Sequence, residues 1–410
     1  MTETGVLIIC AFIVLFAMVA RRLSTTIITA PMVFIAFGVV LSMVGLVPGH
    51  NLEPLLHIVA EVPLVILLFL DASQTDLSAL RKRHVWPSRM LLVGLPLAVG
   101  IGTLAAWPFL SGWPLVAIAL TASILAPTDA ALGQAVVTNT SVPERERRTL
   151  TVESGLNDGL ALPVILLFAS LTAALSGHAE GNEQNWLVFG AMQIVLGPLV
   201  GIAVGFIGGR VLILAQDRKF TSQTFEGVAV LAMAGTAYLL ATEVGGNGFI
   251  SSFIAGLSFG NVVKGRCKFI YEFTESEGQL LIWGAFLLLG MTLVPEAIEY
   301  LTLPVLGIIF TSLFLVRPLA IWLSLIGTDA PPLTRLFFGW FGPRGLATAL
   351  FALLVVAEID HEYAEPILHI AVNAVWISAL LHGLTAVPVA NLYALSSTVR
   401  KLLPNNPTDQ

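Results

Sequence analysis

Residues 150–163 read LTVESGLNDGLALP and place two acids, an amide and a hydroxyl inside an otherwise apolar run. The polar side chains are those of Glu153, Ser154, Asn157 and Asp158. Ser154 and Asp158 are four residues apart, as are Glu153 and Asn157, so a helix presents each pair on one side. The environment of these groups depends on what the rest of the chain forms.

The composition indicates a membrane protein. The chain has 410 residues, of which 56% are hydrophobic and 11% charged, and its mean hydropathy is +0.89. Soluble domains carry about 25% charged residues, and this chain instead repeats apolar runs near the roughly 20 residues that a membrane helix needs. The predicted class is all-α and polytopic. No basic region precedes Leu7, so the first run is predicted to be a span rather than a cleavable signal. The two cysteines, Cys10 and Cys267, are far apart in the sequence, and no disulfide, thiolate metal site or cofactor is expected.

Polar and Pro/Gly clusters divide the chain into thirteen predicted spans. They cover residues 5–20, 29–47, 55–72, 89–110, 112–138, 149–176, 185–209, 222–242, 246–263, 278–294, 300–326, 333–357 and 365–396. All basic residues except Arg317 and Arg344 fall in alternate loops, which is typical of the cytoplasmic side. We therefore expect a multi-pass protein of a cell membrane, of the prokaryotic inner-membrane type. Its N-terminus is predicted outside, and a short cytoplasmic tail is predicted at 397–410.

The thirteen spans can be divided into two sets of six around a spacer. We predict one transmembrane domain over residues 1–396, with inverted repeats at about 5–176 and 222–396 and a linker span at about 185–209. The fifth span of each half contains a proline and a charge: ILAPTDAALGQA at 124–135 and WFGPRGLATA at 340–349. Both spans are predicted to be broken helices.

Four charges are predicted to lie near the membrane midplane. At 1.5 Å per helical residue, Asp129, Asp158, Arg317 and Arg344 lie about 13–17 Å deep in a core about 30 Å thick. A charge at that depth is costly and needs a partner. Glu153 is expected to pair with Arg317, and Arg344 to bind backbone carbonyls or half-helix ends freed at the breaks. Three acids against two arginines leave one negative charge, which suits one monovalent cation or one proton.

The oxygen atoms near this charge are the hard ligands that hard cations prefer. They are the carboxylate, hydroxyl and amide oxygens of Asp158, Ser154 and Asn157, together with the Thr128 carbonyl, which the break at Pro127 would free. A partly desolvated carboxylate also holds a proton more tightly than one in water. Competition between proton and cation at one site, with alternating access, is antiport.

Five ordered motifs resemble one known family. They are APTDA at 126–130, ESGLNDGLALP at 153–163, GGNGFISSFIAGL at 245–257, FLVRPLA at 314–320 and GPRGL at 342–346. In this order and spacing they resemble the monovalent cation–proton antiporters, and most closely the electroneutral NhaP-like branch. The resemblance implies sodium/proton exchange, pH homeostasis, and homodimers in which a six-helix bundle moves against a dimerisation scaffold.

The resemblance also implies site roles. Asp158 resembles the principal ion and proton carrier, and further Na⁺ ligands fall on Ser154, Asp129 and the Thr128 carbonyl. Glu153, Asn157 and Arg317 resemble the buried network around the site, and Arg344 resembles the arginine of the second broken helix. The electrogenic branch has two acids where this chain has Asn157 and Asp158. Many relatives read Thr-Asp-Pro where this chain has Thr128, Asp129 and Ala130, with its proline at Pro127 instead. This departure leaves open both the position of the first break and the choice of cation.

Other interpretations of these residues remain open. For Asp129 the alternative is a cap on the second half of span 5, and for Ser154 it is a small residue at a helix contact. Asp71 and the sequence PERERR at 143–148 are expected to be solvated at the cytoplasmic side, and His369 and His382 are expected to be structural.

The functional alternatives also remain open. A K⁺/H⁺ antiporter of the same fold is the alternative to Na⁺ or Li⁺ exchange, and a passive cation pathway is a further one. The chain carries no Gly-x-Ser-x-Gly, His-Glu-x-x-His or Gly-Asp aspartyl signature, so an enzyme is not expected. The lipid bilayer is an expected partner and nucleic acid is not.

Overall fold

The computed structural model describes residues 3–23, 26–46, 53–75, 77, 85–175, 184–267, 277–356 and 358–396. Within these ranges the regular structure is helical, as predicted, and no strand occurs. The predicted tail at 397–410 lies outside the described residues.

The first half of the chain contains α1 (Glu3–Leu23), α2 (Ala30–Met43), α3 (Glu53–Ser73), α5 (Val85–Arg89), η1 (Met90–Gly94), α6 (Leu95–Ala106), η2 (Trp107–Phe109), α7 (Leu115–Ile124), α8 (Ala130–Val137) and α9 (Glu144–Leu175). The second half contains α10 (Gln184–Asp217), α11 (Gln223–Glu243), α12 (Gly248–Val263), α14 (Glu277–Glu299), α15 (Leu303–Thr311), η3 (Ser312–Val316), α16 (Arg317–Ser324), α17 (Pro332–Trp340), α18 (Leu346–Val356) and α19 (His361–Leu395).

These helices match the predicted spans. In the described part of the chain, 8 helical segments are long and apolar enough to cross a membrane, and five shorter apolar helices accompany them. Together they make thirteen, and each corresponds to one predicted span. The polytopic helical fold is therefore confirmed.

Both predicted helix breaks are present. Span 5 is interrupted between the end of α7 at Ile124 and the start of α8 at Ala130. Span 12 is interrupted between the end of α17 at Trp340 and the start of α18 at Leu346. Each interruption contains a proline, which lacks a backbone N–H and cannot continue the helical hydrogen bonds.

Spans 4 and 11 share a second irregularity that the sequence analysis did not predict. Each contains one π-helical turn, η1 in span 4 and η3 in span 11. The helix that follows has proline at its second position, Pro96 in α6 and Pro318 in α16. A proline ring clashes with the carbonyl one turn earlier, and a wide turn relieves that clash. The turn η3 directly precedes Arg317 and contains Ser312.

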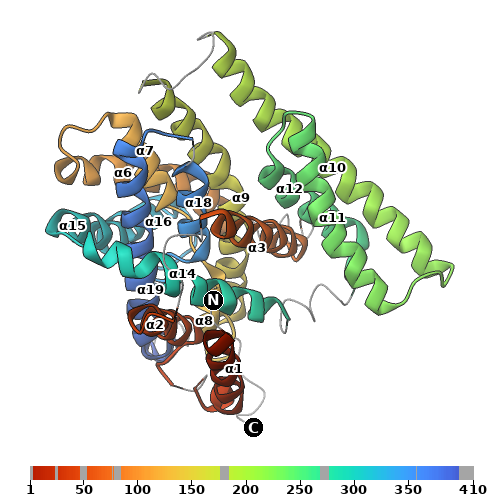
Figure 1. Cartoon of the computed structure of the whole chain (residues 1–410), viewed down its shortest axis with the longest axis horizontal. Helices are drawn as coiled ribbons and strands as arrows, with labels where there is room; N and C mark the ends of the chain where they lie inside the picture. The colour runs from red at the N-terminus through yellow and green to blue at the C-terminus, as the bar shows by residue number, and fades with distance from the viewer. Residues whose placement is uncertain are drawn as a thin grey trace.

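The helices form two sides with a central pair between them. In Figure 1, α10, α11 and α12 lie together on one side, α6, α7 and α15 lie on the other, and α3 and α9 lie between. The crossing of α3 with α12 is close because α12 carries glycine there. A Cβ at Gly256 or Gly260 would overlap the backbone of Phe69 or Ser73 in α3. Small residues permit such close approach between membrane helices, and the crossing fixes the rotation of α3 about its axis.

The start of span 6 differs from the expectation. The sequence PERERR was predicted to be a solvated loop; Glu144, Arg145 and Arg148 are exposed as predicted, but residues 144–148 form the first turns of α9. Glu146 is buried there and accepts a hydrogen bond of 3.1 Å from the Tyr393 hydroxyl of α19. The helix begins at Glu144, five residues before the predicted span, and Glu146 in its first turn is packed against α19.

Candidate functional site

The two broken helices bond to each other through Asp129. Its backbone N–H donates to the Pro343 carbonyl at 2.9 Å, and its Oδ2 accepts from the Leu346 N–H at 2.9 Å. Leu346 is the first residue of α18, so the carboxylate lies at the positive end of that helix. A cap by Asp129 within span 5 stays a prediction, and the structure adds a bond that Asp129 accepts from the other broken helix.

Arg344 makes the reciprocal contact. Its guanidinium donates to the Ala126 carbonyl at 3.0 Å, the Pro127 carbonyl at 3.2 Å and the Ser312 hydroxyl at 3.2 Å. Only 1% of Arg344 is exposed. The two carbonyls follow the C-terminal end of α7, where a cation is favourable. The expectation that Arg344 binds carbonyls freed at a break is confirmed.

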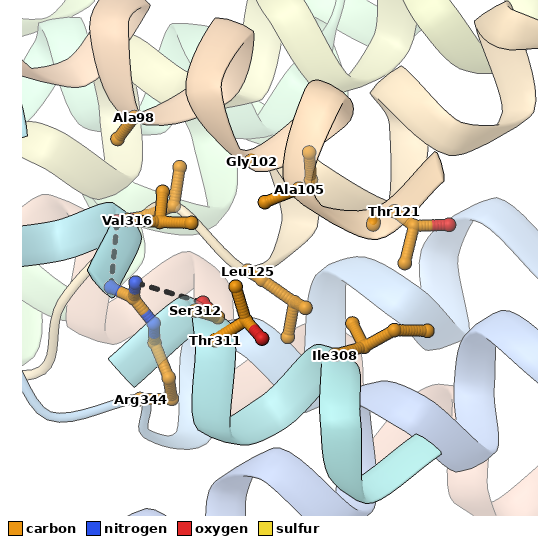
Figure 2. Close-up of a pocket in the computed structure, with 13 residues that line it drawn as sticks. Ala98, Gly102, Ala105, Thr121, Leu125, Ile308, Thr311, Ser312, Val316 and Arg344 are labelled. Carbon is orange, nitrogen blue, oxygen red and sulfur yellow. Dashed lines mark hydrogen bonds between the residues drawn. The ribbon is translucent and has the colours of Figure 1, made fainter. Parts of the chain in front are cut away.

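A small cavity adjoins Arg344. Figure 2 shows it lined by Ala98 and Gly102 of α6, Thr121 of α7, and Ser312 of η3, with the Arg344 guanidinium at one end. Its volume is about 10 Å³, close to the smallest that holds a water molecule. The Nε of Arg344 is buried and has no hydrogen-bond partner within the described part of the chain.

Glu153 and Arg317 form the expected ion pair. Arg317 donates to the two carboxylate oxygens at 2.8 and 3.1 Å, which is bidentate geometry. The side chains are 4% exposed for Arg317 and 3% for Glu153. Glu153 also accepts from the Thr128 hydroxyl at 3.3 Å and from the Asn157 amide at 3.5 Å. The pair therefore connects α9, α16 and the first break.

Ser154 and Asn157 both bind Thr128. The Ser154 hydroxyl donates to the Thr128 carbonyl at 2.8 Å, and the Asn157 amide donates to the Thr128 hydroxyl. Two oxygens predicted as separate ligands are thus bonded to each other. The carbonyl keeps a second lone pair. Asn157 is 1% exposed and does not line the large cavity described next.

The remaining acids line a cavity of about 250 Å³. Asp158 and Ser154 of α9, Asp129 of the first break, and Asp71 of α3 all line it. Its walls also include Val137, at the end of α8, and residues of α14 and α18. The Oδ1 of Asp158 is buried and receives no hydrogen bond from the described residues. A buried acceptor without a donor is costly, so this oxygen is suited to bind a cation or a proton.

Asp71 was missed by the sequence analysis, which placed it in solvent. A signal for it exists in the sequence: Leu64, Leu67, Leu68 and Asp71 follow helical spacing and share one face. All four line the cavity. No group of three His, Cys, Asp or Glu side chains among the described residues is arranged to hold a metal ion. A bound cation would therefore need hydroxyl, carbonyl or water oxygens in addition to the carboxylates.

Comparisons with known proteins agree with this architecture. A family model described as "Sodium/hydrogen exchanger, transmembrane" matches residues 8–392. The K(+)/H(+) antiporter NhaP2 of Shewanella sp. (strain ANA-3) is 28% identical over 394 residues, covering 94% of this chain and 66% of its own length. This chain thus spans slightly less than two thirds of that relative.

Two archaeal proteins are also similar. The probable Na(+)/H(+) antiporter 2 of Methanocaldococcus jannaschii is 24% identical over 384 residues, covering 87% of this chain and 89% of its own length. The solved structure of the sodium proton antiporter MjNhaP1 from the same organism, at pH 8, superposes with a TM-score of 0.77 at 20% identity, covering 96% of this chain and 99% of that one. At that identity the structural match shows the fold.

Proposed function

Because this chain belongs to the sodium/hydrogen exchanger family, we propose that it exchanges Na⁺ or Li⁺ for H⁺ across a membrane, one for one. The observation that carries the proposal is the buried Oδ1 of Asp158, to which no described residue donates a hydrogen bond, in a cavity shared with two other acids. A carboxylate oxygen in that position can bind a cation or a proton, and not both at once. Exchange follows if the site is exposed to the two sides of the membrane in turn.

The proposed cation ligands are Asp158, Asp129, Ser154 and the carbonyl of Thr128. The bond between the Ser154 hydroxyl and the Thr128 carbonyl holds these two oxygens together. Asp129 keeps its negative charge through the N–H of Leu346, which leaves Asp158 as the group that accepts the proton. Glu153, Asn157, Arg317 and Arg344 support the site without contacting the ion.

Asp71 changes the charge count. Asp71, Asp129, Glu153 and Asp158 are four acids, and Arg317 and Arg344 are two arginines, so two negative charges remain uncompensated rather than one. One-for-one exchange is still neutral, because a cation or a single proton leaves the same charge in the cavity. We propose that Asp71 contributes attraction for the cation and that its protonation does not change during the cycle.

The identity of the cation has a second candidate. The relative from Shewanella is named a K(+)/H(+) antiporter and matches 94% of this chain, so K⁺ is proposed as the alternative substrate. The cavity supports either ion because it is lined by carboxylate and hydroxyl oxygens and is large enough for bridging water.

The proposal extends to assembly and orientation. We propose one domain of two inverted repeats, since the π-helical turn and the break occupy the fourth and fifth spans of both halves. We also propose a homodimer in a prokaryotic inner membrane, with the N-terminus outside and the C-terminus in the cytoplasm. The positions of the basic residues support this orientation.

The test uses the purified protein in liposomes that contain a pH-sensitive dye. Adding Na⁺, Li⁺ or K⁺ outside should move protons in the opposite direction, and the order of apparent KM values identifies the substrate. Asp158→Asn should abolish the exchange. Asp329→Asn, at an exposed acid remote from the cavity, is the matched control and should keep it. Full exchange by Asp158→Asn would refute the single-carrier mechanism.

A further inference from the structure

The second helix break depends on a neighbouring helix for its hydrogen bonds. Between Trp340 and Leu346 the backbone is not helical, so its polar groups need other partners. Such groups cannot be left unpaired at membrane depth. The Asp129 N–H donates to the Pro343 carbonyl, and the Asp129 carboxylate accepts from the Leu346 N–H. Two further groups of the break, the carbonyl of Trp340 and the N–H of Arg344, are bound from α19, and the Trp340 carbonyl also accepts from the Gly342 N–H at 2.9 Å.

Two residues of α19 make these bonds. Ser378 and His382 are four residues apart on one face of the helix and are 0% and 2% exposed. The Arg344 N–H donates to the Ser378 hydroxyl at 2.8 Å. The His382 Nε2 lies 3.0 Å from the Trp340 carbonyl. The His382 Nδ1 lies 3.1 Å from the Ser378 hydroxyl and 2.9 Å from the Ser378 carbonyl.

A neutral His382 ring that bonds to the second break has one arrangement of hydrogens. A carbonyl only accepts, so the His382 Nε2 carries a hydrogen and donates it to Trp340. In a neutral ring the Nδ1 then accepts, and the Ser378 hydroxyl is the donor that reaches it. The Ser378 oxygen in turn accepts from the Arg344 N–H. The result is an unbroken chain of hydrogen bonds from the backbone of Arg344 through Ser378 and His382 to Trp340.

A charged ring fits the surroundings less well. Its Nδ1 would have to donate to the Ser378 carbonyl in place of accepting from the hydroxyl, and the hydroxyl would lose that acceptor. The charged groups near the ring are the guanidinium groups of Arg344 and Arg317, and both repel a second cation. No described carboxylate bonds to the ring. The two guanidinium groups therefore favour a neutral ring, and a neutral ring donates to the Trp340 carbonyl only with its hydrogen on Nε2.

Resting on the proposed exchange function, we propose that Ser378 and His382 are positioning residues for the cation site. They hold the backbone of Arg344 against α19. The guanidinium of Arg344 holds the carbonyls of Ala126 and Pro127. These residues directly precede Thr128, whose carbonyl is a proposed ligand. Loss of the α19 contacts should let the two breaks move apart and weaken cation binding more than it slows turnover.

The chain offers a matched control on the same helix. Thr385 accepts from the Trp340 indole N–H at 3.2 Å but bonds to no backbone group of the break. Thr385→Val removes a hydrogen bond of the same kind from the same neighbour. It should leave the apparent KM within about twofold of the wild type.

The experiment compares five variants in the liposome assay, with apparent KM and maximal rate measured separately. His382→Leu and Ser378→Ala should raise the cation KM about fivefold to tenfold, the size expected for one lost buried hydrogen bond. Maximal rates should stay within about twofold. His382→Gln keeps an amide N–H that can reach the Trp340 carbonyl, and Ser378→Thr keeps the hydroxyl, so both should restore a low KM. Because a positioning role requires no change in the protonation of the ring, His382→Gln should leave the pH profile of exchange unshifted.

Two results would overturn the proposal. One is an unchanged KM in Ser378→Ala and His382→Leu. The other is a KM in His382→Gln as poor as in His382→Leu at equal thermal stability. If His382→Leu does not fold, Ser378→Ala against Ser378→Thr gives the same comparison. A wild-type protein that exchanges no cation would instead refute the proposed function, and the positioning role with it.

Discussion

Replacing Glu153 by glutamine should destabilise the protein strongly, because it leaves the guanidinium of Arg317 buried without a charge partner. Both side chains are less than 5% exposed, and two bonds of 2.8 and 3.1 Å join them. Removing one member of such a pair costs about 3–5 kcal/mol. Arg317→Gln should cost a similar amount, since it leaves the carboxylate unpaired.

The double variant separates the pair from its surroundings. Two glutamine amides are neutral and can hydrogen-bond to each other. The loss of unfolding free energy in the double variant should therefore be smaller than the sum of the two single losses by at least about 2 kcal/mol. Free energies of unfolding come from titration in mixed lipid and denaturing-detergent micelles, followed by tryptophan fluorescence. Additive losses, with a coupling below about 0.5 kcal/mol, would refute the pairing as a unit.

The same double variant also tests the role of Glu153 in exchange. It removes one negative and one positive charge, so the number of uncompensated charges is unchanged. We expect the folded double variant to exchange cations with a KM within about threefold of the wild type. This limit follows because the pair does not contact the ion and should contribute less than about 1 kcal/mol to its binding. A folded double variant without exchange would show that Glu153 takes part in transport itself.

Three further predictions concern other parts of the molecule. Hydrogen bonds from Arg145 hold the pKa of Asp329 below its ordinary value of 3.8, so its ionised form stabilises the fold above that pH and the benefit is lost as the pH falls through the lowered pKa. Asp329→Asn should therefore lower the free energy of unfolding at pH 7 by no more than the ~1 kcal/mol of an exposed pair, with a slightly lower thermal midpoint. A difference in midpoint from the wild type that persisted under strongly acidic conditions would contradict this. Gly260→Ala should cost about 1–3 kcal/mol through overlap with α3. Gly235→Ala, which meets open space, is its control, and equal thermal midpoints for the two would contradict the close crossing. Ser154→Ala should raise the cation KM about fivefold or more with little change in maximal rate, measured by dye dequenching, because it removes one ligand oxygen.

The sequence predicted the features that follow from a local rule. A proline and a charge in the middle of an apolar run predict a break, and Pro127 and Pro343 lie in breaks. A charge at membrane depth needs a partner, which predicted the contact of Glu153 with Arg317 and that of Arg344 with freed carbonyls.

The sequence did not predict what depends on helix rotation. Asp71 lines the cavity because the crossing with α12 at Gly256 and Gly260 sets which face of α3 points inward. The same holds for Ser378 and His382, whose contacts exist only once α19 lies beside the second break. The bond between Ser154 and Thr128 also depends on the shape of the first break, which spacing along the chain does not specify.

The central claim is that one cation and one proton compete for Asp158 without net charge movement. The most direct measurement records current from liposomes on a solid-supported membrane while a Na⁺ gradient drives proton flux that the dye reports in parallel. We predict proton flux without sustained current in the wild type, and neither signal in Asp158→Asn. A current that grows with the cation gradient would contradict the claim, and its loss in Asp71→Asn would identify Asp71 as the carrier of a second proton.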